Sequence, residues 1–313
     1  MANITSLQTR ACGSANQLNS FRDSERALTC CKRARKEIEI GNYDAGCALL
    51  APWWKLGDWP AQEGLDPVAA GHLLLTAGSL TDSVVRVKRV LGGQRLAEAL
   101  LSGAIALFDH LGERTRAIEA RIELGCCYYH QGLFDIAHST LKSCIEELSI
   151  EDFELKAVAL IRLAIVERHS GRLQEALSLL EQVSSLEDSS SMWTKGRFRT
   201  EMANTLKAFG VAEGENHYFD YALTHYKEAS LQFEQVGNLR YVAAVENNRG
   251  YLLLSLKRFK ESEIHLERAR TLFKKLGDAI GCAQVDETLA QLYIASDRHD
   301  SAESAIKRAV DTL

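Results

Sequence analysis

The chain has 313 residues, of which 46% are hydrophobic and 25% are charged, and its formal net charge at pH 7 is -5. This length is long for one compact core, so either two domains or an elongated array is expected. The acidic balance gives no electrostatic reason to bind nucleic acid or an anionic membrane. Residues 1–20 lack a basic segment followed by an apolar one, and no apolar run is long enough to span a bilayer. A cytoplasmic protein without membrane contact is therefore predicted.

The first predicted elements are less regular than the later ones. Residues 1–22 are polar and are predicted to form a flexible N-terminal segment. A first helix pair is predicted at Ser24–Ile40 and Tyr43–Leu50, separated by the turn residues Gly41 and Asn42. From residue 23 onward the chain is expected to consist of helical hairpins.

An aromatic loop follows the first pair of helices. All three prolines fall between residues 52 and 67, and the same stretch contains Trp53, Trp54 and Trp59. These side chains could form a platform for a ligand or a hydrophobic lid over the first hairpins, and the lid is favoured.

A second irregular pair is predicted at Pro67–Leu80 and Arg95–Leu111. Gly92 and Gly93 form an insertion between the two helices, and Ala99 takes the position of the small residue in the second helix. Small residues are expected at such positions because two helices approach closely only where the crossing side chains are small.

From about residue 114 a regular pattern recurs. A Gly or Ala, preceded by an apolar residue, is followed by a large apolar residue three positions later and by Ala or Ser twelve positions later. Between Ala203 and Ala222 this last spacing is nineteen, so Gly210–Tyr221 is read as an insertion that lengthens one turn. The recurrences are Leu124-Gly125, Tyr128, Ala137 and Leu141; Leu163-Ala164, Ala176 and Leu180; Met202-Ala203 and Leu206; Gly250, Leu253, Ser262, Leu266 and Ala269; and Leu289-Ala290, Tyr293, Ala302, Ile306 and Ala309.

These residues resemble the tetratricopeptide repeat family, whose loose consensus has Leu-Gly, Tyr and Ala at matching spacing. The period is close to forty residues, which resembles the longer-helix branch that includes kinesin light chain and many bacterial regulators. The resemblance implies an all-α fold, a right-handed superhelical solenoid of antiparallel helix pairs. About six to seven hairpins would fill residues 23–313, degenerate in 23–113 and regular in 114–313.

The last predicted helix ends the chain without a polar capping helix. Val310 and Leu313 are apolar and close to the chain end. Because the terminal repeats of a solenoid need a polar outer face for solubility, the array is expected either to continue beyond this chain or to self-associate through its open end.

No catalytic or cofactor motif is present: the sequence has no HExxH, paired CxxC, P-loop, GxSxG or Rossmann glycine pattern, so neither an enzyme nor a cofactor is predicted. The best metal candidate is Cys126 with His130, one helical turn apart, with His169 in the next repeat. No further ligand accompanies them, and no metal site is predicted. The eight cysteines are read as reduced, mostly buried residues.

The family resemblance implies that the first helix of each hairpin lines a concave, partner-binding surface. Its cations and amides would suit a carboxylate or an acidic peptide, although such residues also solvate ordinary helix faces. Its isoleucines would form an exposed apolar patch if they line the groove. The candidate partner-binding residues are Ile122, Tyr129, His130, Ile161, Ile165, Arg168, His169, Arg197, Asn204, Lys207, Asn247, Tyr251, Glu287 and Gln291.

Two functions follow from this interpretation. The first is a non-catalytic scaffold or sensor that binds a protein or peptide segment on the concave face, with an acidic segment as one candidate. The alternative is a regulatory, signal-sensing module of a bacterial transcriptional or signalling regulator whose output domain is not in this chain. An enzyme and direct nucleic-acid binding are both disfavoured.

Overall fold

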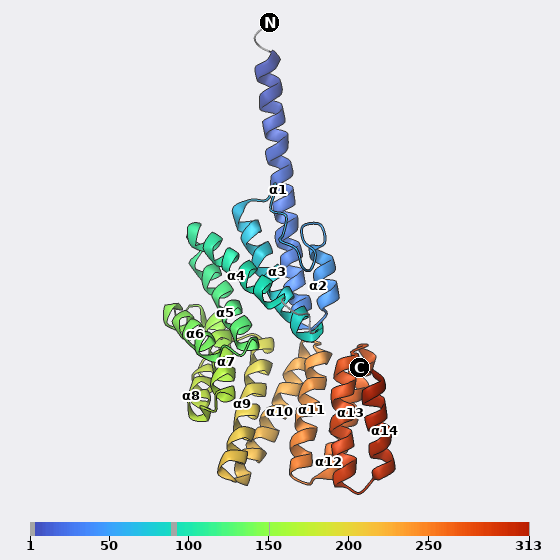
Figure 1. Cartoon of the computed structure of the whole chain (residues 1–313). Helices are drawn as coiled ribbons and strands as arrows, with labels where there is room; N and C mark the ends of the chain where they lie inside the picture. The colour runs from blue at the N-terminus through green and yellow to red at the C-terminus, as the bar shows by residue number, and fades with distance from the viewer. Residues whose placement is uncertain (1–3, 89–92, 150, 313) are drawn as a thin grey trace. The chain divides into compact units, whose positions relative to one another are not determined.

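The structure, a computed structural model, describes the backbone of residues 4–88, 93–149 and 151–312. It describes the side chains of residues 21–86, 93–149, 151–187 and 189–311, so that the predicted insertion residue Gly92 and the terminal Leu313 lie outside. Within these residues the chain forms fourteen α-helices and one 3-10 helix, and no strand (Figure 1). The predicted all-α fold is therefore confirmed.

The chain divides into two compact units, residues 1–148 and 149–313. This boundary does not coincide with the change from degenerate to regular repeats expected near residue 113. The units are described separately below. Unit 1 contains α1 (Ile4–Glu39), α2 (Tyr43–Leu50), α3 (Pro67–Lys88), α4 (Gly93–His110), α5 (Arg114–His130) and α6 (Phe134–Glu147).

The helices of unit 1 follow the predicted pairs with two differences. α1 begins at Ile4 rather than at Ser24, so the described backbone of residues 4–22 is helical instead of irregular. In α4 the buried small residues are Ala97 and Ala104, whereas Ala99 is exposed. The prediction of Ala99 as the packing residue was wrong, because Ala97 and Ala104 are the small residues of α4 that lie in the core of unit 1.

Two glycines of α3 allow α4 to pack closely against it. A Cβ atom on Gly71 would lie 2.7 Å from the ring of Phe108, and one on Gly78 would lie 2.8 Å from the side chain of Leu101. Both large residues are fully buried and belong to the main core of unit 1. The helix pair thus depends on the small-against-large packing that the repeat pattern predicted.

The aromatic loop between α2 and α3 packs onto this core. Trp54 is buried and donates its indole N–H to the carbonyl oxygen of Asp58, 3.0 Å away. Trp53 packs against the core, and Trp59 lies over Gly103 of α4 while keeping 51% of its surface exposed. Trp53 and Trp54 therefore pack onto the core of unit 1, as expected for a hydrophobic lid.

One helix of unit 1 is long and apolar enough to cross a membrane by length and composition alone. This stretch, Pro67–Arg86, lies in α3, and 83% of its most apolar window is buried inside the protein. Such burial is what the core helix of a folded domain shows.

Unit 2 consists of hairpins that contact one another in chain order, the arrangement of a solenoid. Each first helix pairs with the helix that follows it: α7 with α8, α9 with α10, α11 with α12 and α13 with α14. The elements are α7 (Phe153–His169), α8 (Leu173–Ser184), the 3-10 helix η1 (Glu187–Ser189), α9 (Met192–Glu213), α10 (Asn216–Gln235), α11 (Leu239–Ser255), α12 (Phe259–Lys275), α13 (Ala279–Ala295) and α14 (His299–Thr312).

The repeat pattern places the small residues of unit 2 at the helix contacts. A Cβ atom on Gly250 would lie 2.6 Å from the side chain of Leu266, and Ser262 donates its hydroxyl to the Gly250 carbonyl at 2.7 Å. Ala176 and Ala222 are fully buried at the corresponding position of α8 and α10. The predicted register of these hairpins is confirmed.

The insertion predicted at Gly210–Tyr221 does not form a longer turn. Instead, α9 has 22 residues and α10 has 20, whereas α11 and α12 have 17 each. Only Gly214 and Glu215 separate the two longer helices. The hairpin stays closed near its tip because Phe219 packs directly onto Gly210.

The turns inside the hairpins use left-handed backbone. In the α7–α8 turn this position is Gly171, with φ of 78°. In the last two hairpins it is taken by Lys257 and Asp297, with φ of 59° and 56°. Side chains carrying Cβ are disfavoured in this conformation, so these two turns carry backbone strain.

Candidate functional site

The candidate site lies on the first helices of the hairpins in unit 2. We call it the first-helix face, and it is built from residues that recur at equivalent positions of successive repeats. Its members are Ile165, Arg168 and His169 of α7, Arg197, Asn204 and Lys207 of α9, Asn247 and Tyr251 of α11, and Glu287 and Gln291 of α13.

Two predicted members of the partner-binding surface are buried. Ile122 of α5 is 1% exposed and Ile161 of α7 is 3% exposed. The equivalent Thr200 of α9 is also buried. The predicted apolar patch is therefore wrong for these isoleucines: a first helix within a stack has neighbours on both flanks, and only a narrow stripe stays open. Ile165 is half-buried on that stripe.

A connected polar cluster occupies the centre of the first-helix face. Arg168 donates a guanidinium N–H to Glu201 Oε2 at 3.1 Å, and the amide of Asn204 donates to the same oxygen at 3.1 Å. Tyr226 of α10 completes the cluster by donating its hydroxyl to Asn204 Oδ1 at 2.6 Å. The Glu201 carboxylate thus fixes side chains from two successive first helices.

Lys207 lies beside this cluster without a carboxylate partner of its own. Among the described residues its ammonium forms no ion pair, and it lies 5.5 Å from the ring centroid of Tyr251. Burial lowers the pKa of Lys207, the positive charge of Arg168 lowers it further, and Glu201 opposes the shift. A negative charge placed beside the Lys207 ammonium would therefore stabilise its charged form.

The centre of the face consequently carries two cations and one carboxylate. Among the described residues, the Nε atom of Arg168 is buried and has no hydrogen-bond partner. Within the same part of the chain, the Oδ1 atom of Asn247, one helical turn before Tyr251, is likewise buried without a partner. Buried polar atoms normally have partners, so these two atoms mark an environment suited to further polar contacts.

Arg197 does not add a third cation to this centre. Its guanidinium donates to the hydroxyl of Tyr241 at 2.9 Å and lies 5.5 Å from the centroid of that ring. Trp193 packs edge-on against the same tyrosine, with ring centroids 4.6 Å apart. Arg197 is thus held by aromatic groups of α9 and α11.

The remaining members are open to solvent to different degrees. Tyr251 is 43% exposed, and Glu287 and Gln291 of α13 are exposed. His169 is exposed as well, with its Nδ1 atom 3.0 Å from the carbonyl oxygen of Ile165. These exposed groups lie on the first helices of three different repeats, where they are able to contact an extended chain.

Two predicted residues, Tyr129 and His130, belong to unit 1. His130 Nδ1 lies 2.8 Å from Asp82 Oδ2, and the centroids of the Tyr129 and His130 rings are 5.2 Å apart.

Within the described residues no group of three His, Cys, Asp or Glu side chains is arranged to hold a metal ion. Burial raises the pKa of Cys127 to about 12, so its thiol stays protonated at neutral pH.

Three partners of the site were not singled out from the sequence: Glu201, Tyr226 and Tyr241. Glu201 precedes Asn204 by three residues, so helical spacing places both on one side of α9 and offered a signal. Tyr226 and Tyr241 come from neighbouring helices, and only the fold brings them to Asn204 and Arg197.

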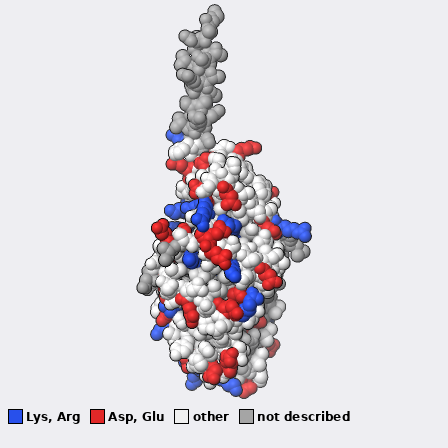
Figure 2. All heavy atoms as spheres, turned by 90° about the vertical axis from the view of Figure 1, so that its left-hand side faces the viewer, with Lys and Arg blue, Asp and Glu red and all other residues white. Residues whose placement is uncertain are grey.

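Charges of both signs are interspersed on the face of the molecule that Figure 2 shows. This distribution matches the modest net charge of the chain. A single-sign field, the usual footprint of a nucleic-acid-binding surface, is not what that face displays.

The family model of the tetratricopeptide repeat matches residues 241–313, which span α11 to α14. No curated protein matches the chain in sequence. The predicted resemblance to tetratricopeptide repeats is thereby confirmed for the last two hairpins, and the solved structures below extend it as a likeness of fold.

Three solved structures illustrate this likeness. BtubC (BKLC) from P. vanneervenii is 21% identical with a TM-score of 0.58, and the match covers 70% of this chain and 90% of that one. The Rap conjugation gene regulator of plasmid pLS20, in complex with the Phr* peptide, is 13% identical with a TM-score of 0.64, over 89% of this chain and 71% of that one. A putative kinesin light chain with TPR-like repeats from Podosopora anserina is 16% identical with a TM-score of 0.50, over 62% and 93%.

Proposed function

We propose that the chain is a non-catalytic binding module whose first-helix face holds an extended protein or peptide segment, with an acidic group of that segment between Arg168 and Lys207. The observation that carries the proposal is the charge imbalance at the centre of the face. Two partly buried cations face the single carboxylate of Glu201. A partner carboxylate would neutralise the excess charge through charge-assisted hydrogen bonds.

The surroundings of the two cations support a peptide as the partner. Tyr251 offers a partly exposed aromatic ring beside Lys207. Asn247 and Gln291 offer amides, which can both donate to and accept from a peptide backbone. Aromatic anchors combined with adaptable polar groups are typical of peptide-binding surfaces.

The similar Rap regulator was solved with a bound peptide, which fits a sensing role. That peptide is a ligand of the Rap protein, and a peptide signal for this chain is part of the proposal. A cytoplasmic location belongs to the proposal too, supported by described cysteines that are all free thiols. A regulatory module with an output domain elsewhere remains the alternative.

A displayed library of random linear peptides, selected against the full chain, tests the proposal. We expect the recovered peptides to contain Asp or Glu and to bind Lys207→Met about 10- to 100-fold more weakly than the parent chain, as for loss of a charged hydrogen bond. The matched control is Lys227→Met, at an exposed lysine of α10. Equal binding by all three proteins would refute a role for Lys207, and the absence of any selected peptide would refute the peptide-binding function.

A further inference from the structure

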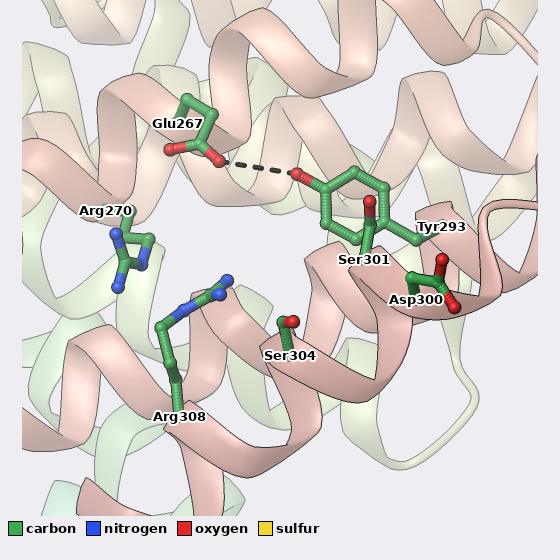
Figure 3. Close-up of a pocket in the computed structure, with 7 residues that line it drawn as sticks. All are labelled: Glu267, Arg270, Tyr293, Asp300, Ser301, Ser304 and Arg308. Atoms are coloured by element: carbon green, nitrogen blue, oxygen red, sulfur yellow. Dashed lines mark hydrogen bonds between the residues drawn. The ribbon is translucent and has the colours of Figure 1, made fainter.

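A hollow of about 350 Å³ opens between α12 and α14, over Tyr293 of α13 (Figure 3). Its walls come mainly from the second helices of two successive hairpins, whereas the first-helix face consists of first helices only. The hollow therefore involves none of the residues assigned above to peptide binding.

The sequence creates this hollow by placing small residues where the preceding repeat has larger ones. Ser304 lies forty residues after Ile264, and Ser301 lies forty residues after Glu261. Ile264, at the equivalent position of α12, is a large side chain that is 67% exposed. The two serines of α14 are smaller and add hydroxyl groups to the lining.

One end of the hollow is positively charged. Arg270 Nε donates to Asp286 Oδ1 at 2.8 Å, and Arg308 donates to the same oxygen through Nε at 3.0 Å and Nη2 at 2.8 Å. Asp286 is buried, so two guanidinium groups share one carboxylate. Figure 3 shows the two arginines approaching each other from opposite helices, with Ser304 near Arg308.

Two carboxylates also line the hollow. Tyr293 donates its hydroxyl to Glu267 Oε1 at 3.4 Å, and Glu267 precedes Arg270 by three residues on α12. Asp300 of α14 adds the second carboxylate, and the guanidinium of Arg298 lies 4.5 Å from the centroid of the Tyr293 ring. Burial, together with the charges of Glu263 and Glu267, raises the pKa of Tyr293 to about 12. The phenol therefore remains a proton donor at neutral pH.

We propose that this hollow binds a small zwitterion, a molecule with a carboxylate and an ammonium group a few bonds apart, such as a free α-amino acid. The carboxylate would face Arg270 and Arg308 and accept from the hydroxyl of Ser304. The ammonium would donate to Glu267. Each end of the ligand then meets the opposite charge, and neither group of the ligand is buried without a partner.

Calorimetric titration and thermal unfolding of the full chain with each of the twenty common α-amino acids test this proposal. At a concentration ten times Kd, we expect a saturable rise in Tm of about 2 °C for at least one of them. Acetate and ethylamine, each carrying only one of the two charges, should give no saturable response at that concentration.

Ser304→Ile fills the hollow with the residue that the protein itself carries one repeat earlier, so the variant should fold. Without ligand its Tm should equal that of the parent chain within about 2 °C, while its response to the amino acid is lost. The reverse change, Ile264→Ser, serves as the control and should leave the response intact. A response that survives Ser304→Ile, an equal response to acetate alone, or no saturable response to any amino acid would overturn the proposal.

Discussion

Lys257 occupies a left-handed backbone position that glycine takes in the α7–α8 and α9–α10 turns. This conformation costs a residue with a Cβ atom about 1 to 2 kcal/mol, whereas glycine adopts it freely. Glycine in turn loses about 0.5 to 1 kcal/mol more conformational entropy on folding. Lys257→Gly should therefore raise the free energy of unfolding by about 0.5 to 1 kcal/mol.

Urea unfolding followed by circular dichroism measures this difference. Asp297→Gly is the internal comparison, because Asp tolerates the left-handed region better than Lys and should gain less. The two turns lie in separate hairpins, so the effects should add in the double variant. A Lys257→Gly protein that is no more stable than the parent, or a larger gain from Asp297→Gly, would refute the reasoning.

Three further results are expected. Ala176→Leu should overpack a fully buried helix contact and cost about 1 to 3 kcal/mol, while the exposed Ala99→Leu changes Tm little; a parental Tm for Ala176→Leu would contradict the repeat register. Glu246 is buried, which by itself raises its pKa, but hydrogen bonds and nearby positive charges lower the pKa overall. The ionised Glu246 therefore stabilises the fold above its unfolded pKa of about 4.3, and this stabilisation is lost as the pH falls through its folded pKa. Glu246→Gln should be less stable than the parent chain at pH 7. In acid-unfolding curves the variant should also lose less stability than the parent chain as the pH is lowered. The pair Arg168→Glu and Arg197→Glu should abolish binding of the selected peptides without changing helicity by circular dichroism, and unaltered affinity would exclude the polar centre of the face.

The repeat pattern predicted the hairpins well where it was regular. Gly250 and Ala176 lie at helix contacts because only small side chains fit there. The recurrence of small residues at a fixed spacing makes this requirement visible in the sequence. At Ala99 the same rule failed, because the buried residue is Ala97, two positions earlier, and the degenerate repeats before residue 114 offered no regular spacing from which to fix the register. Around Gly210 the residue count revealed seven extra residues but could not tell a loop from longer helices.

The sequence predicted which residues of the candidate site lie on one side of a helix, but not which side chains they contact. Helical periodicity placed Lys207 and Tyr251 on one side of their own helices, and the structure brings the two together. Periodicity did not reveal that Ile122 and Ile161 are buried, because exposure depends on the neighbouring helices. The pairing of Arg197 with Tyr241 depends in the same way on how α9 packs against α11.

The shared carboxylate of Asp286 has a consequence for how the last hairpin opens. One buried acidic group on α13 ties α14 to α12 through two arginines, so releasing α14 alone would break two of the three arginine hydrogen bonds to Asp286. Amide hydrogen exchange in α13 and α14 should consequently be slow and cooperative, with both helices opening together.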